Sequence, residues 1–129
     1  MKRTVSLVFC LGLLVSCQTH QKIAEHKVID GHIEAANEND YARFKSFFHA
    51  EIEGYDFPNE LKFKGFEELD KTYMTFINTV KKKATIKERL IKGNFVIDLE
   101  HLKTDRGELE IPVVYEMKDN KIYRIMFLR

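Results

Sequence analysis

From residue 84 to its end the chain alternates apolar with polar residues, the pattern of strands that bury one face. Gly-Asn, Asp-Arg-Gly and Asp-Asn turn signals divide this half into four segments. We therefore predict an antiparallel meander of strands over residues 84–91, 95–102, 109–117 and 122–128. The clearest alternation is that of Leu109, Ile111, Val113, Tyr115 and Met117.

Before this meander the spacing of apolar residues is helical. We expect a first helix over residues 23–36, with an apolar stripe of Ile29, Ile33 and Ala36. Asp40 suits the N-cap of a second helix, because its carboxylate can accept from free backbone N–H groups. The apolar residues of that second helix are expected to be Tyr41, Phe44, Phe47 and Phe48.

One more strand and one more helix complete the expected order. The strand covers residues 51–57 and ends at the turn pair Pro58-Asn59. Gly65 precedes a third helix over residues 66–80, whose apolar residues recur with helical period. The order α-α-β-α-β-β-β-β predicts an α+β domain in which helices cover one face of a curved sheet.

Residues 1–16 differ from everything that follows. Lys2 and Arg3 precede an almost unbroken apolar run from Val5 to Val15. The run is too short to span a bilayer, which needs roughly 20 residues, but it suits the apolar region of a secretory signal. Its end, LLVSCQ, resembles the lipobox of bacterial lipoproteins, in which Cys17 would carry the lipid. The alternative is a buried N-terminal helix with two incidental cysteines.

The lipobox resemblance implies three segments: a cleaved signal peptide over residues 1–16, a lipidated tether over 17–22 and one domain over 23–129. Cys10 would leave with the signal and Cys17 would be acylated, so no free thiol would remain. Acyl chains would hold the protein to a membrane of the bacterial cell envelope. In a Gram-negative host we expect the outer membrane.

The charge balance excludes one class of partner. Loss of Lys2 and Arg3 lowers the 21 basic residues to 19, against 20 acidic residues. A nucleic-acid-binding domain would need a basic excess, so we expect no nucleic-acid partner. The sequence has no HExxH or paired-cysteine metal motif, no glycine-rich phosphate loop and no Gly-x-Ser-x-Gly elbow. We expect neither a metal nor a cofactor.

Four segments of the chain carry a further resemblance: AANENDYARFKSFF, YDFPNELKFKGFEEL, RLIKGNFVIDLE and VVYEMKDNKIYRIMFLR. In their order and spacing they resemble the SnoaL-like, ketosteroid-isomerase-related branch of the nuclear-transport-factor-like superfamily. The resemblance implies a cone-shaped, cystatin-like fold, in which a bent sheet wraps around the helices and leaves an apolar pocket. It also implies a homodimer through the sheet, the assembly of many members.

The catalytic residues of ketosteroid isomerases do not carry over to this chain. Those enzymes use an Asp base with a Tyr and a protonated Asp as oxyanion donors. The resemblance places the Tyr at His32, the base at Gly54 and the second Asp at Pro112. Only His32 keeps a polar side chain, so we do not expect ketosteroid isomerisation.

The candidate catalytic residues are His32, Asp98 and Glu100. By the family match His32 points into the cone, where an imidazole could serve as acid, base or ligand anchor. Its alternative role is that of an inert, hydrogen-bonded core residue. Asp98 and Glu100 share one face of a strand, since they lie two residues apart. If the two side chains face the pocket, burial and like charge could raise the pKa of one of them. If they face solvent, they are ordinary surface carboxylates.

Further residues are candidates for the pocket wall, and packing is the alternative for each. Arg89 could instead form a structural salt bridge with Asp98 or Glu100. Counting from Pro112 places Tyr115 on the opposite, dimer-facing side of its strand. The full set of predicted pocket residues is Tyr55, Asp56, Tyr73, Phe76, Arg89, Ile125 and Phe127.

Together these patterns predict a lipid-anchored protein that binds a small, apolar or amphipathic molecule in the cone. Its candidate activity is cofactor-independent acid–base chemistry of the isomerase or hydratase type. The alternative is a non-catalytic, dimerising interaction domain of the cell envelope. A roomy cavity in which His32 meets a carboxylate would favour the first function. A cone filled by Phe76, Phe95 and Phe127 would favour the second.

Overall fold

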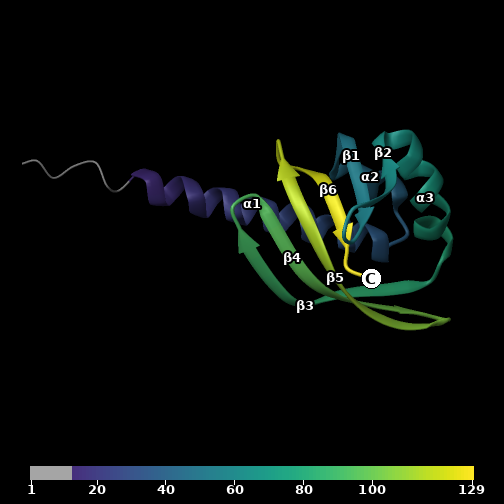
Figure 1. The fold of residues 1–129 in the computed structure, drawn as a ribbon. Helices are drawn as coiled ribbons and strands as arrows, with labels where there is room; N and C mark the ends of the chain where they lie inside the picture. Colours follow the sequence, from purple (N-terminus) through teal and green to yellow (C-terminus); the bar gives the residue numbers. More distant parts are fainter. Residues whose placement is uncertain (1–12) are drawn as a thin grey trace, which may run out of the picture.

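The computed structural model describes the backbone of residues 13–129 and the side chains of residues 24–129. Its first helix, α1, runs over Leu13–Asn37, and its N-terminal part projects from the domain (Figure 1). Residues 1–12 and the side chains of residues 13–23 lie outside the described part, so cleavage of the predicted signal peptide and lipidation of Cys17 stay predictions. The helical backbone of α1 covers the predicted tether. In the described part of the chain, no helix has the length and apolar character to cross a membrane.

The C-terminal part of α1 is held in the domain by the predicted apolar stripe. Ile29, Ile33 and Ala36 are all buried. Gly31 allows the Phe47 ring to approach α1 closely, because a Cβ at residue 31 would lie 2.6 Å from that ring.

The second helix, α2, covers Tyr41–Ser46 and begins as predicted. The Asp40 carboxylate accepts a hydrogen bond of 3.0 Å from the Arg43 backbone N–H, which caps the helix. The prediction that Phe48 belongs to this helix is wrong. Phe48 is the first residue of strand β1 (Phe48–Asp56) and pairs with Ile122, which buries its ring in the core.

Six strands form one sheet in the order β2-β1-β6-β5-β4-β3. All neighbouring pairs are antiparallel except β1 and β6, which run parallel. The predicted meander is confirmed as β3 (Lys82–Lys92), β4 (Phe95–Thr104), β5 (Gly107–Lys118) and β6 (Lys121–Phe127).

Helix α3 spans Gly65–Thr79. A short strand, β2 (Glu60–Lys64), lies between β1 and α3 in the chain. We did not predict β2, although its Leu61 and Phe63 alternate with polar residues over five positions. Only Phe63 of this strand is buried.

Irregularities in strand pairing bend the sheet. The register shifts between Gly54 and Tyr55 of β1, and again within the β3–β4 and β5–β6 pairs. Such bulges increase bending and local twist. The long strands β3, β4 and β5 therefore curve beneath the helices (Figure 1). This arrangement confirms the predicted α+β class, with a curved sheet packed on three helices.

Candidate functional site

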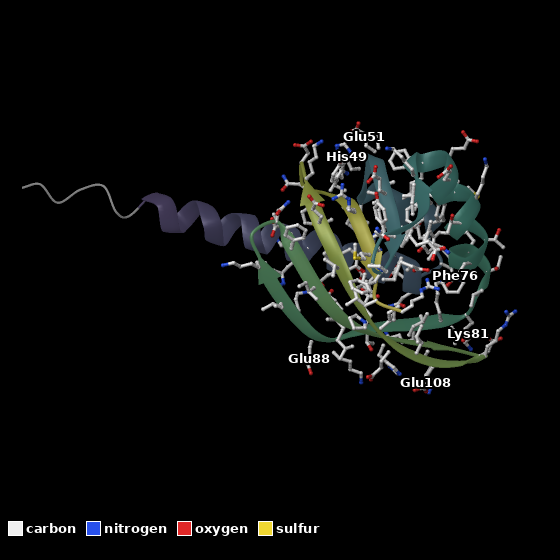
Figure 2. The ribbon with its side chains drawn as sticks, in the orientation of Figure 1. His49, Glu51, Phe76, Lys81, Glu88 and Glu108 are labelled. Atoms are coloured by element: carbon white, nitrogen blue, oxygen red, sulfur yellow. The ribbon has the colours of Figure 1, made fainter. Side chains whose placement is uncertain are left out.

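A cavity of about 470 Å³ lies inside the cone, between the concave face of the sheet and the helices. This volume is within the usual range for small-molecule sites. Figure 2 shows Phe76 on α3 beside this space, whereas Glu88 and Glu108 point away from the domain. The aromatic part of the wall comprises Phe44, Phe48, Phe63, Tyr73, Phe76 and Phe127. The polar lining comprises His32, Thr72, Lys82, Glu100, Tyr115 and Arg129.

The cone is therefore not filled by its aromatic residues. Phe76, Phe127 and Ile125 line the cavity as predicted, and so does Tyr73. Phe95 does not enter the cone, since its side chain is 42% exposed on the outer face of β4. The cavity thus lacks the aromatic filling that would favour the interaction domain.

Glu100 and Tyr115 form the central polar pair of the cavity. They lie on adjacent strands, β4 and β5, and the Tyr115 hydroxyl donates a hydrogen bond to Oε1 of Glu100. Burial raises the pKa of Glu100 from 4.5 to about 7, while the bond from Tyr115 acts in the opposite direction. A carboxyl with such a pKa can take up or release a proton near neutral pH.

The prediction that Tyr115 faces away from the cavity is wrong. Ile111, Val113 and Tyr115 alternate along the concave face of β5 and are buried. Pro112 lies on the outer face of β5. Taking Pro112 as a cavity-facing position therefore placed Tyr115, three residues later, on the wrong face. The alternation of β5 in the sequence contained the correct signal.

His32 also lines the cavity, as the family match predicted, and it is buried. Its Nδ1 lies 2.9 Å from the backbone carbonyl of Ile29. A carbonyl can only accept, so Nδ1 carries the proton and Nε2 of the neutral ring is an acceptor. Burial lowers the pKa of His32 to about 4 despite this hydrogen bond.

Aromatic rings fix the orientation of the His32 imidazole. The ring of Phe44 lies at a centroid distance of 5.2 Å, Phe48 at 5.6 Å and Tyr115 at 5.4 Å. His32 and the Glu100–Tyr115 pair therefore belong to one cluster, because Tyr115 contacts both residues.

Asp98 and Arg89 do not line the cavity, although Asp98 shares the concave face with Glu100. The buried carboxylate of Asp98 accepts two bonds of 2.7 Å from the Arg89 guanidinium. Arg89 also donates to Asp30 at 2.9 Å and lies 3.2 Å from Nδ1 of His26, both on α1. The Arg89–Asp98 pair is thus the structural salt bridge that we weighed as an alternative, and it ties α1 to the sheet.

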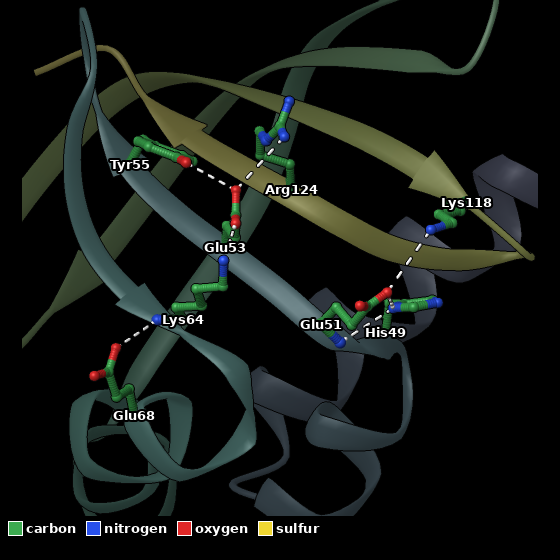
Figure 3. Close-up of polar contacts among 8 residues, drawn as sticks. All are labelled: His49, Glu51, Glu53, Tyr55, Lys64, Glu68, Lys118 and Arg124. Atoms are coloured by element: carbon green, nitrogen blue, oxygen red, sulfur yellow. Dashed lines mark hydrogen bonds and ion pairs between the residues drawn. The ribbon is translucent and has the colours of Figure 1, made fainter.

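Tyr55 lies on the outer face of the sheet, so its assignment to the pocket is wrong (Figure 3). Its hydroxyl donates to Glu53 at 2.8 Å, and Glu53 also pairs with Lys64 at 2.9 Å and Arg124 at 3.5 Å. The reason is alternation: Gly54 faces inward, so its neighbours in β1 face outward.

Asp56 borders the cavity without lining it. Its carboxylate lies 3.3 Å from Nε of Arg129, which does line the cavity, and 3.7 Å from Nζ of Lys62. Lys82 and Arg129 are polar lining residues that the sequence analysis missed, because neither belongs to a recognisable motif.

Gly54 occupies the position that the resemblance assigns to the base of ketosteroid isomerases. The Phe63 ring fills the space beside it, since a Cβ on Gly54 would lie 2.1 Å from that ring. The cavity therefore has an aromatic wall where those enzymes carry a carboxylate. Among the described side chains, no three His, Cys, Asp or Glu residues converge as metal ligands would.

No protein-family model matches the chain, and no curated protein matches it. Solved structures do match. An uncharacterised cystatin-fold protein from Novosphingobium aromaticivorans is 18% identical with a TM-score of 0.73, over 81% of this chain and 97% of that chain. An NTF2-like protein from Cytophaga hutchinsonii is 14% identical with a TM-score of 0.65, over 80% and 87%.

A predicted polyketide cyclase from Sinorhizobium meliloti is 13% identical with a TM-score of 0.67, over 78% of this chain and 93% of that chain. The chain has the cystatin-like fold of the NTF2-like and SnoaL-like proteins. The fold implied by the four sequence segments is thereby confirmed. At these identities the likeness concerns the fold, and any chemistry must be argued from the cavity.

Proposed function

We propose that the domain binds a small, mostly apolar molecule in the cone and transfers a proton to or from it through Glu100. The observation that carries this proposal is the Glu100–Tyr115 pair inside a cavity of about 470 Å³. Apolar walls supply affinity through burial of the ligand. The raised pKa of Glu100, about 7, supplies both protonation states near neutrality.

Each polar group of the cluster has a separate role in this proposal. The Glu100 carboxylate removes a proton from the ligand, and its protonated form returns one. The Tyr115 hydroxyl bonds to Glu100 and holds the carboxyl towards the cavity. Nε2 of neutral His32 accepts a hydrogen bond from a ligand hydroxyl or N–H group.

Proton removal and return by one carboxyl fit two reaction types. In an isomerisation the proton returns to a different atom of the same molecule. In a hydration or dehydration Glu100 moves the proton of the water that is added or lost. Neither reaction needs a cofactor, and the fold also occurs in the predicted polyketide cyclase described above.

Native mass spectrometry after incubation with an extract of the host tests the proposal. We expect the wild type to retain a small molecule, and we expect His32→Ala to weaken the signal of that complex.

Proton transfer is tested in D₂O. The wild type should exchange ligand C–H protons for deuterium, as detected in the released molecule. Glu100→Gln should retain the molecule but slow the exchange by about 10²- to 10⁴-fold. Glu110→Gln, on an exposed position of β5, is the matched control. Equal exchange in the wild type and Glu100→Gln would refute the catalytic role.

An interaction domain that dimerises through its sheet is the second candidate. Leu90 and Phe95 support it, because they are 62% and 42% exposed on the outer face of β3 and β4. Sedimentation velocity tests this assembly. A dimer that Leu90→Glu converts to a monomer would favour the interaction domain, and a monomeric wild type would eliminate it.

We further propose that Cys17 anchors the domain to a membrane of the cell envelope. The support is the sequence order of positive charge, apolar run and lipobox. Membrane fractionation with Cys17→Ala tests the anchor. The wild type should sediment with membranes and incorporate labelled palmitate, whereas the variant should not incorporate it.

A further inference from the structure

The cavity is lined by one carboxyl, that of Glu100, and by two cationic side chains, those of Lys82 and Arg129. Glu100 belongs to the proposed proton-transfer pair. The two cations have no role in that chemistry, and their surroundings differ.

Lys82 is committed to the fold. Its ammonium donates to the carbonyl of Ile77 at 2.7 Å, the carbonyl of Val80 at 3.1 Å and Oδ1 of Asn39 at 3.5 Å. These three acceptors use all three donors of an ammonium group. The carbonyls stand at the C-terminus of α3, where a cation is favourable. Lys82 therefore caps a helix and has no donor left for a ligand.

Arg129 is directed to the cavity by the backbone of β6. The N–H of Leu128 donates to the carbonyl of Pro112 at 3.0 Å, so the pairing with β5 continues beyond Phe127. Because side chains alternate along a strand, Arg129 and Phe127 share one side. The Arg129 guanidinium lies 5.2 Å from the centroid of the Phe127 ring, and both residues line the cavity.

The guanidinium of Arg129 keeps donors for a ligand. Its one polar contact with a described residue joins Nε to the Asp56 carboxylate at 3.3 Å. Asp56 forms an ion pair with Nε, and the two terminal nitrogens make no hydrogen bond with a described residue. They form the planar fork that binds an anionic group through two parallel hydrogen bonds. The Arg129 side chain is 60% exposed, which places this fork at the mouth of the cavity.

We propose that Arg129 binds the anionic group of an amphipathic ligand whose apolar body occupies the cone. The inference rests on the proposed function and narrows its ligand to a molecule with a carboxylate, sulfonate or phosphate at one end. With this group at the mouth, the far end of the ligand lies against the aromatic wall and the Glu100–Tyr115 pair. Arg129 is then the residue that sets the orientation of the ligand.

Two fluorescent probes with the same skeleton test this inference on the full chain. 1-Anilinonaphthalene-8-sulfonate carries an anion, and N-phenyl-1-naphthylamine lacks it. Arg129→Gln should weaken binding of the sulfonate by about 1.4- to fivefold, the range for an exposed ion pair. The affinity for the neutral probe should not change. Asp56→Asn removes a competing carboxylate and should tighten the sulfonate only. Arg124→Gln, on the other face of β6, should change neither affinity.

The outcomes separate this inference from the proposed function. If the neutral probe binds and Arg129→Gln leaves the sulfonate affinity unchanged, the anion subsite is refuted while the cavity stands. If Arg129→Gln weakens both probes equally, the residue shapes the mouth and does not select charge, which also overturns the inference. If neither probe binds the wild type, the ligand cavity itself fails, and the subsite with it.

Discussion

Replacing Glu100 by Gln should change how the stability of the domain depends on pH. Burial raises the pKa of Glu100 in the folded state from 4.5 to about 7. The folded state therefore holds this proton more tightly than the unfolded state does. The resulting stabilisation is fully present below pH 4.5 and is lost as the pH rises through 7. A glutamine has no proton to exchange, so the variant lacks this dependence.

The magnitude follows from the separation of the two pKa values. About 2.5 pH units correspond to about 3 kcal/mol in the free energy of unfolding. The wild-type curve alone would hide this effect, because His32 contributes with the opposite sign. Its pKa falls from 6.5 to about 4 on folding, so its contribution is full above pH 6.5 and is lost as the pH falls through 4. Between pH 4.5 and 6.5 the two slopes oppose each other.

Urea unfolding of both proteins between pH 4 and 8 isolates the Glu100 contribution as a difference. The free energy of unfolding of Glu100→Gln should rise relative to the wild type by about 3 kcal/mol from pH 4 to 8. Glu110→Gln, which alters an exposed carboxylate on the same sheet, should show no comparable trend. A difference between Glu100→Gln and the wild type that stays flat over this range would refute the raised pKa and, with it, the proposed acid–base role.

Three further substitutions test the surroundings of this carboxyl. His32→Gln should gain about 3 kcal/mol over the wild type as the pH falls from 6.5 to 4, measured by the same urea titration. Tyr115→Phe removes a bond that lowers the pKa of Glu100, so the NMR titration midpoint of that carboxyl should rise above 7. Asp98→Asn leaves the Arg89 guanidinium without its buried counter-charge and should cost about 3–5 kcal/mol in urea at pH 7. A loss below 1 kcal/mol would contradict a structural role for that pair.

The order of helices and strands was predictable because the spacing of apolar residues and the positions of turn-forming residues indicate the same elements along most of the chain. The alternation in β5 and the cap at Asp40 are local signals, and both survive in the fold. Strand β2 was missed, since its place depends on pairing with β1 through contacts such as Gly54 with Phe63. Phe48 was assigned to a helix because apolar spacing is ambiguous over four residues. Pairing with β6, far along the chain, decides its conformation.

The candidate site was predictable only in part. The two-residue spacing of Asp98 and Glu100 correctly placed both on one face of β4. It could not tell that Asp98 meets Arg89 beneath α1 while Glu100 reaches the cavity, because that depends on where the helix crosses the strand. Arg129 carries no local pattern at all. Its position at the mouth follows from β-pairing with a strand that is distant in sequence.

The placement of polar groups within the cone constrains any chemistry that this protein performs. The β1 position that the resemblance assigns to a base is Gly54, and Phe63 closes that wall. A carboxylate introduced at residue 54 would meet the ring and not the cavity, so it would not restore such a base. The Glu100 carboxyl stands on β4 instead, bonded to Tyr115 on β5. In the proposed reaction a ligand would present its reacting atom to the β4–β5 side of the cone, with the aromatic wall at Phe63 against its unreactive face. The fold is shared with the NTF2-like proteins, but in the proposed reaction these side chains would set the direction of proton transfer.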